Sequence, residues 1–131
     1  MSLTLTAQKN NDKNKNGIDI TVTINKIPNN KGVVRFALYT EKGFLETPVL
    51  RETGTIKNGK TEVTFKNVAN NVYSIVCYHD VNENKILDFM PNGMPTEDIG
   101  VTNNRISFGP PSFKETKFTV NSKPLNFEIK F

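Results

Sequence analysis

Hydrophobic and polar residues alternate along most of the chain from Gly17 onward. The clearest stretch is residues 18–24, Ile-Asp-Ile-Thr-Val-Thr-Ile, in which every second side chain is apolar. Successive side chains of a β-strand point to opposite faces, so this period predicts a strand with one buried face. Similar short stretches predict further strands over residues 33–39, 55–57, 60–65, 114–120 and 125–131, and an apolar run predicts another over residues 72–78.

Three local features refine these elements. Asn58-Gly59 stands between two of the predicted strands and tolerates the positive φ angles of a type I′ turn, so the sequence predicts a hairpin there. Residues 72–78 are apolar on both faces, which is typical of a central strand covered on two sides. Between residues 40 and 50, Pro48 restricts any helix to a turn.

About seven short strands without a helix of ordinary length predict an all-β fold. We expect an antiparallel β-sandwich, immunoglobulin-like in its general plan, whose two sheets bury their alternating faces against each other. A closed barrel is the alternative. Because the last strand reaches the final residue, Phe127, Ile129 and Phe131 are expected in the core, where truncation would be costly.

The chain of 131 residues has room for one core, so we expect a single domain over residues 17–131. Residues 8–16 carry no apolar side chain, and residues 1–16 are expected to form a flexible head. Residues 3–7, Leu-Thr-Leu-Thr-Ala, have two interpretations. They are either the end of a signal peptide cleaved after Ala7 or an arbitrary N-terminus.

Charge and cysteine content exclude several classes of function. The net charge of +4 comes from scattered lysines rather than a basic stripe interleaved with aromatic residues, so we expect no nucleic-acid partner. No apolar run approaches the roughly 20 residues of a membrane helix, and we expect no membrane span. The single cysteine, Cys77, permits no internal disulfide, and no Cys/His cluster has zinc spacing.

The period of two stops between Tyr78 and Lys114, which is long for a connection in a compact sandwich and indicates an ordered functional loop over residues 79–113. Its first part has the oxygen spacing of a calcium loop: side chains at relative positions 1, 3, 5 and 9, and a backbone carbonyl at position 7. Glu97 or Asp98 could supply a remote closing carboxylate, as could Glu83 if the loop turns differently, and Glu97 is the preferred candidate. The candidate Ca²⁺ ligands are therefore Asp80, Asn82, Asn84, Ile86, Asp88 and Glu97.

The calcium pattern is incomplete, because Lys85 stands where the bend favours Gly and Pro91 where a bidentate Glu would close the shell. A network of Asx turns without metal is the alternative. With two neutral amides among its ligands, any Ca²⁺ site is expected to be weak. The other residues expected to bind a ligand or orient the loop are His79, Asp98, Asn103, Asn104, Pro110 and Phe113.

A catalytic role has little support in the sequence. His79 is the only histidine, and its neighbour Asp80 points to the opposite face of the strand, so the two do not form a base and its orienting acid. Cys77 lies mid-strand and is expected to be a core residue. A small hydrolase or isomerase using His79 with Glu97 or Asp98 is the alternative to a non-enzymatic module.

Three linked blocks resemble one bacterial family. They are His79-Asp80-x-Asn82-x-Asn84-x-x-Leu87-Asp88, then Gly93-x-Pro95-x-Glu97-x-x-Gly100-x-x-Asn103-Asn104, then Pro110-Pro111-Ser112-Phe113-x-x-x-x-Phe118. Together they are similar to the signature of the domain-of-unknown-function family 2141, with which the likeness runs from Ile18 to the C-terminus. This resemblance implies an exported protein, periplasmic, cell-surface or secreted, with no settled activity. Family members commonly carry Gly where Lys85 stands and Gly where Glu83 stands.

A second pattern, Phe65-x-x-Val68-x-x-x-x-Tyr73-x-Ile75, resembles an element of transthyretin-like sandwiches and implies a prealbumin-like arrangement of about seven strands. Taken together, the sequence predicts an exported, non-enzymatic β-sandwich that binds a ligand or a cell-envelope or extracellular partner, as a monomer or weak dimer. Its elaborate end is residues 79–113, and Ca²⁺ is the one cofactor that the sequence suggests.

Overall fold

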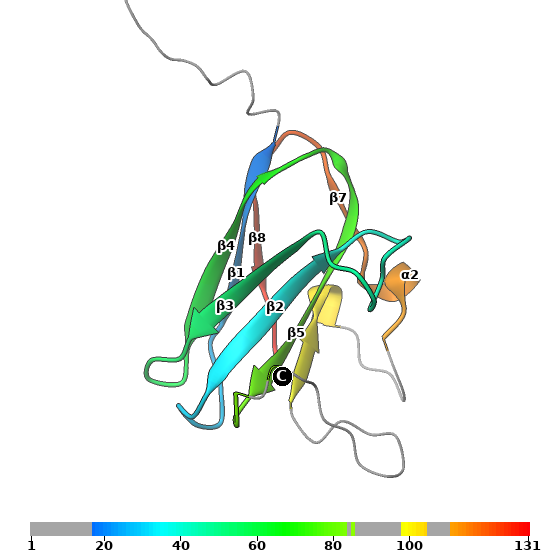
Figure 1. Cartoon of the computed structure of the whole chain (residues 1–131). Coiled ribbons are helices and arrows are strands. Elements are labelled where there is room, and N and C mark those ends of the chain that lie inside the picture. Colours follow the sequence, from blue (N-terminus) through cyan, green and yellow to red (C-terminus); the bar gives the residue numbers. More distant parts are fainter. Residues whose placement is uncertain (1–16, 84, 86–97, 105–110) are drawn as a thin grey trace, which may run out of the picture.

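A computed structural model of the chain describes residues 17–83, 85, 98–104 and 111–131. Two sheets pack face to face (Figure 1). The first contains β4 (Thr61–Val68), β1 (Ile18–Ile24) and β8 (Leu125–Glu128), in that order. The second contains β3 (Leu50–Thr55), β2 (Val33–Tyr39), β5 (Asn71–Asp80) and β6 (Ile99–Val101), and β7 (Phe118–Val120) pairs with the start of β5.

The architecture confirms the predicted all-β sandwich, and most of its ladders are antiparallel. One pairing, between β1 and β8, is parallel. The core lies between the sheets, where every second residue of β1 and β2 is buried, as the alternation predicts. Phe36 on β2 and Phe65 on β4 are its largest fully buried side chains.

The predicted hairpin at Asn58-Gly59 is only partly correct. Both residues have positive φ, 55° and 74°, as a type I′ turn requires, but the flanking chains share only the bridge between Lys57 and Lys60. The strand before the turn is β3, which starts at Leu50 rather than Thr55 and pairs with β2 in the opposite sheet from β4. The turn therefore carries the chain from one sheet to the other.

The predictions after β5 also need correction. β5 continues through His79 and Asp80, and the predicted long loop contains β6 and a short 3-10 turn, η2 (Thr102–Asn104). Residues 113–116 form the helical turn α2 (Phe113–Thr116) instead of the start of a strand. Ser112 caps it by accepting a hydrogen bond from the Glu115 amide at 3.2 Å, which satisfies an otherwise unpaired donor.

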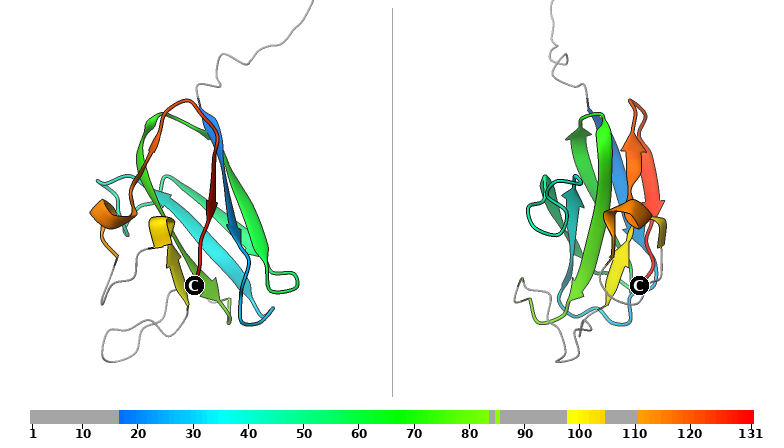
Figure 2. Two further views of the ribbon diagram at one scale, coloured as in Figure 1. Left: turned by 180° about the vertical axis from the view of Figure 1, so that it is seen from behind. Right: turned by 90° about the vertical axis from the view of Figure 1, so that its right-hand side faces the viewer.

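The chain ends beside the last residues of β5, where the Phe131 ring stacks on His79. Figure 2 shows the C-terminus next to the end of β5 and next to β6. The Ile129 side chain is 1% exposed, and its amide donates to the Thr23 carbonyl at 2.9 Å. Phe127 and Phe131 are partly buried against the same core, so the predicted role of the last residues in packing is seen in the structure. No helix in the part of the chain that the structure describes is long and apolar enough to cross a membrane.

Candidate functional site

His79 is held inside the molecule at the end of β5. Its side chain is 2% exposed, and its ring lies parallel to that of Phe131, at 6.3 Å between centroids. Nε2 is 2.6 Å from the Lys31 carbonyl, which can only accept, so Nε2 carries the hydrogen. The His79 amide also donates to the Asp98 carbonyl at 2.9 Å. The imidazole thus joins β5 to the segment before β2 and to the C-terminus.

Asp80, the next residue, is fully buried and forms an ion pair with Arg35. Arg35 Nε donates to Asp80 Oδ2 at 2.6 Å, and the Lys85 amide donates to the same oxygen at 2.9 Å. The Arg35 side chain is 22% exposed, so the guanidinium reaches solvent while the carboxylate does not. A buried carboxylate needs such charge-assisted partners, and here they attach the first residues after β5 to β2.

Gly32 makes the close approach of these two strands feasible. It has a φ of +69°, and a Cβ built on it would lie 2.1 Å from the Asp80 carbonyl oxygen. Both the angle and the space therefore require glycine. Because Gly32 stands immediately before β2, the His79 and Asp80 backbone sits directly against the entry to that strand.

Glu83 and Lys85, which follow Asp80 in the sequence, adopt backbone conformations that glycine favours. Glu83 has a φ of 54° and Lys85 a φ of 66°, both in the left-handed region. These are the positions at which the family resemblance implies Gly. Glu83 and Lys85 both carry a Cβ, so these backbone conformations are strained for them.

The predicted calcium ligands are described only in part. Asp80 is buried and Asn82 is exposed, whereas Asn84, Ile86, Asp88 and Glu97 lie outside the described residues. No group of three or more His, Cys, Asp or Glu residues able to hold a metal occurs among the residues that the structure describes. For the alternative pair of a hydrolase, Asp98 brings its backbone carbonyl to His79 and exposes its side chain.

Asn103 and Asn104 connect η2 to the C-terminal half of the sandwich. Both have positive φ, 69° and 49°. The Asn103 amide donates to the carbonyls of Glu115 and Lys117 at 3.2 and 3.0 Å. The Asn104 side chain donates to the Glu128 carbonyl at 2.9 Å and accepts from the Lys130 amide at 2.8 Å. The Asn104 amide group thus takes the place of a neighbouring strand along the end of β8.

A buried network of hydroxyl groups, which the sequence did not indicate, lies under η2 and α2. Ser74 Oγ and Thr116 Oγ1 are 2.6 Å apart, and Thr116 Oγ1 also donates to the Ser112 carbonyl at 2.9 Å. Thr102 Oγ1 accepts from the Ile75 amide at 3.2 Å and donates to the Thr116 carbonyl. Ser74, Thr102 and Thr116 are all buried. The network fixes the 113–116 turn on β5.

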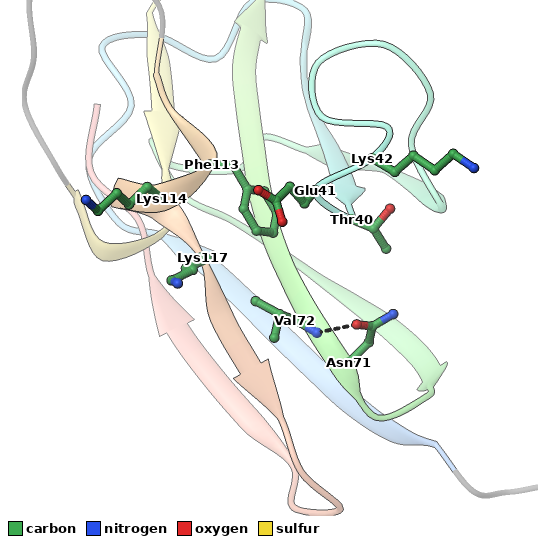
Figure 3. A pocket seen from close by; sticks show the side chains of 8 residues that line it. All are labelled: Thr40, Glu41, Lys42, Asn71, Val72, Phe113, Lys114 and Lys117. Atoms are coloured by element: carbon green, nitrogen blue, oxygen red, sulfur yellow. Dashed lines mark hydrogen bonds between the residues drawn. The ribbon is translucent and has the colours of Figure 1, made fainter.

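Beside this network an open depression of about 830 Å³ lies between α2, the start of β5 and the segment after β2 (Figure 3). Phe113, which the sequence suggested as a ligand-binding or loop-orienting residue, lines it, and Pro110 lies outside the described residues. The Phe113 ring packs edge-on against Phe44 at 5.6 Å, and Phe44 packs edge-on against Tyr39 at 5.7 Å. The lining residues are Thr40, Glu41, Lys42, Asn71, Val72, Phe113, Lys114 and Lys117.

Cys77 is a core residue in the structure. It is fully buried, its Sγ donates to the Gly100 carbonyl at 3.5 Å, and burial raises the pKa of its thiol. A thiolate is the reactive form of cysteine, so this environment suppresses nucleophilic chemistry. Arg35 was missed by the sequence analysis, although a charged residue within the apolar strand 33–39 was a signal for a buried partner.

Comparison with protein-family models gives one match, to the family described as "Uncharacterized protein conserved in bacteria (DUF2141)", over residues 22–128. The chain belongs to this family. The matched range includes both sheets, the residues at the end of β5 and the depression beside α2, and it confirms the resemblance seen in the three sequence blocks. No match was found among curated proteins or among solved structures. The transthyretin-like resemblance stays a prediction.

Proposed function

We propose that this member of the DUF2141 family is an exported, non-enzymatic β-sandwich module that acts in the bacterial envelope or outside the cell by binding. One observation carries the proposal: the histidine, the cysteine and Asp80 are all buried and bonded to structural partners. These side chains, which could act as catalytic groups at an exposed site, instead hold the strands and adjoining segments of the sandwich together. The frame at the end of β5, made by His79, Asp80 and Arg35, is suited to present the residues that follow it.

A weak Ca²⁺ site over residues 80–88 is the second part of the proposal. The oxygen spacing and the left-handed φ angles at Glu83 and Lys85 support it. Arg35 supplies the counter-charge to Asp80 in the described structure, so a bound Ca²⁺ would share that carboxylate with the guanidinium or replace it. This competition is a physical reason for low affinity, together with the neutral amide ligands.

Thermal unfolding in EDTA, in 10 mM CaCl₂ and in 10 mM MgCl₂ tests the calcium site. An affinity of about 0.1 to 1 mM would stabilise the fold by about 1.4 to 2.7 kcal/mol at that concentration, which raises Tm by several degrees. Asp88→Asn should abolish the Ca²⁺-specific shift, whereas Asp19→Asn, a carboxylate on β1, should retain it. Equal Tm values in EDTA and CaCl₂ would refute the Ca²⁺ site and leave an Asx-turn network.

Export is tested separately. Cells that produce the protein from its native gene are fractionated, and the protein is followed by immunoblot alongside cytoplasmic and periplasmic markers. The proposal expects the protein with the periplasmic, surface or secreted fractions. A cytoplasmic location would overturn the proposed export.

A further inference from the structure

The depression beside α2 is built from three segments that are distant in the sequence and are held together by packing. Residues 40–42 follow β2, Asn71 and Val72 begin β5, and residues 113–117 form α2 and its C-cap. The edge-on contacts from Phe113 to Phe44 and from Phe44 to Tyr39 fix the first and third segments to each other. The contact between the buried Thr116 and Ser74 hydroxyls fixes the third segment to β5, and Ser112 caps the turn within that segment. The hollow is thus part of the fold.

Its charges are unbalanced. Lys42, Lys114 and Lys117 line it together with a single acidic residue, Glu41. Among the residues that the structure describes, no ion pair holds any of the three lysines. Lys114 and Lys117 are three residues apart along a helical turn and project on the same side of Phe113, with Lys42 at the opposite rim (Figure 3). Like charges at this spacing repel each other, and an anion placed between them removes that repulsion.

The remaining groups suit a ligand rich in hydroxyls. Phe113 and Val72 are half-buried and give an apolar floor, while the Thr40 hydroxyl and the Asn71 amide offer neutral hydrogen-bonding groups. Asn71 Oδ1 accepts from the Val72 amide at 2.7 Å, which turns its NH₂ group away from the strand (Figure 3). Lys114 also lines a second depression, with Asn103, Ser112 and Glu115. The surface around Lys114 is therefore longer than the first depression alone.

From this combination we infer that the surface formed by the two depressions around Lys114 binds an acidic oligosaccharide. The carboxylates would lie at Lys114 and Lys117, the C–H face of one sugar ring on Phe113, and sugar hydroxyls at Thr40 and Asn71. A volume of about 830 Å³ is within the range of ~300–1,000 Å³ that ligand sites occupy. This inference goes beyond the proposed function and uses none of the candidate calcium ligands.

The test is an NMR titration of the ¹⁵N-labelled full chain with trigalacturonate, with maltotriose as the neutral control and inorganic phosphate as the anion control. We expect saturable shifts at Val72, Phe113 and Lys117 with trigalacturonate alone. Affinity should weaken as NaCl is raised from 20 to 300 mM, because the lysines are exposed. Lys114→Gln/Lys117→Gln should lose roughly tenfold or more in affinity, at about threefold or more for each lysine removed.

The matched control is Lys26→Gln/Lys66→Gln, which removes two exposed lysines that line neither depression and should leave the affinity within twofold. Three results overturn the inference: no saturable shift up to about 20 mM trigalacturonate, equal binding by the Lys114/Lys117 variant, or phosphate binding as tightly as trigalacturonate. All of these are read on EDTA-treated protein, so they are independent of the calcium experiment and of export.

Discussion

At the scale of single residues, the ion pair of Arg35 and Asp80 is asymmetric in a way that determines what each partner contributes. The carboxylate is fully buried and the guanidinium is 22% exposed. Removing Arg35 takes a guanidinium away from a fully buried carboxylate, whereas removing the charge of Asp80 leaves a cation that solvent can reach. The pair therefore serves the framework chiefly by making burial of Asp80 tolerable.

We predict that Arg35→Gln destabilises the fold by about 3 kcal/mol, near the cost of breaking a buried pair, and Asp80→Asn by about 1 to 2 kcal/mol, since the amide still accepts from Lys85. Urea unfolding measures both. In the double variant the two costs should be less than additive. A larger loss for Asp80→Asn than for Arg35→Gln would contradict this account.

A second prediction at this scale concerns Lys85. Its φ of 66° costs an ordinary residue about 1 kcal/mol or more, and glycine avoids that strain. Lys85→Gly should therefore leave the free energy of unfolding equal or higher, although glycine gives the unfolded chain more freedom. Lys66→Gly, within β4, is the comparison and should lose roughly 1 kcal/mol. Equal losses for the two variants would show that the bend at Lys85 is not strained.

At the scale of elements, side chains of η2 and α2 form hydrogen bonds that attach these segments to strands, where elsewhere backbone groups of paired strands form them. Asn104 bonds to both Glu128 and Lys130 along the end of β8, and the hydroxyl network attaches α2 to β5. The sheets are thus tied together through short polar contacts as well as through the core. These contacts are the places at which single substitutions should loosen one element.

We predict that Thr116→Val destabilises the fold by about 1 to 3 kcal/mol, because it leaves the buried Ser74 hydroxyl without its partner. Adding Ser74→Ala should recover part of the loss, since both polar groups are then removed. Chemical denaturation of the three variants gives the coupling. If the double variant equalled the sum of the singles, the two hydroxyls would not be acting as a pair.

The sequence predicted strands correctly where buried and exposed residues alternate. It predicted elements poorly where the structure of a segment depends on which distant segment it contacts. β1 and β2 follow from alternation alone, because one face of each meets the other sheet, whereas β5 was predicted from apolar residues on both of its faces. The turn at Asn58-Gly59 was predicted from local backbone preference, but pairing depends on which sheet each flanking strand joins. The helical turn at 113–116 carried a signal that was overlooked: Ser112 followed three residues later by Glu115 is a capping pattern.

The candidate site was likewise predicted only in part: single residues stood out in the sequence, but their contacts did not. Asp80 and His79 stood out in the sequence by residue type, but their burial depends on Arg35, Lys31 and Phe131, which are at least 45 positions away. The depression beside α2 gathers residues from three distant segments, and only the one around Phe113 belongs to a sequence block that stood out in the sequence. Such a surface becomes visible only once the strands are placed.

At the scale of the whole molecule, the core closes around Cys77 and around the last residues of the chain. Cys77 is on β5, which contacts β2, β6 and β7, so its thiol is exposed only when the second sheet opens. Ile129 belongs to the same core, and Phe131 packs against it. Exposure of the Cys77 thiol and loss of the C-terminal contacts should therefore both accompany unfolding of the whole domain.

Removing residues 129–131 should therefore cost about 3 kcal/mol or more, from the burial of Ile129 and the contact of Phe131 with His79. The truncated chain should show a much lower Tm or no cooperative transition by circular dichroism. Lys130→Ala, an exposed position between them, should keep a Tm close to that of the parent. A truncated chain with an unchanged Tm would mean that the C-terminal residues are not part of the core.

Cys77 also predicts how stability depends on pH. Burial raises the pKa of its thiol in the folded state, whereas in the unfolded chain the thiol ionises near ~8.5. The unfolded state therefore loses a proton that the folded state keeps, and the free energy of unfolding falls as pH rises above that value, by about 1.4 kcal/mol per pH unit. Urea unfolding between pH 7 and 9.8 should show this decline in the parent and lose it in Cys77→Ala.

The two tyrosines set the upper limit of this experiment. Because burial also raises the pKa of Tyr39 and Tyr73, the free energy of unfolding of both the parent and Cys77→Ala should begin to fall near pH 10. Equal pH dependence of the parent and the variant below about pH 10 would place the Cys77 thiol in contact with solvent in the folded state.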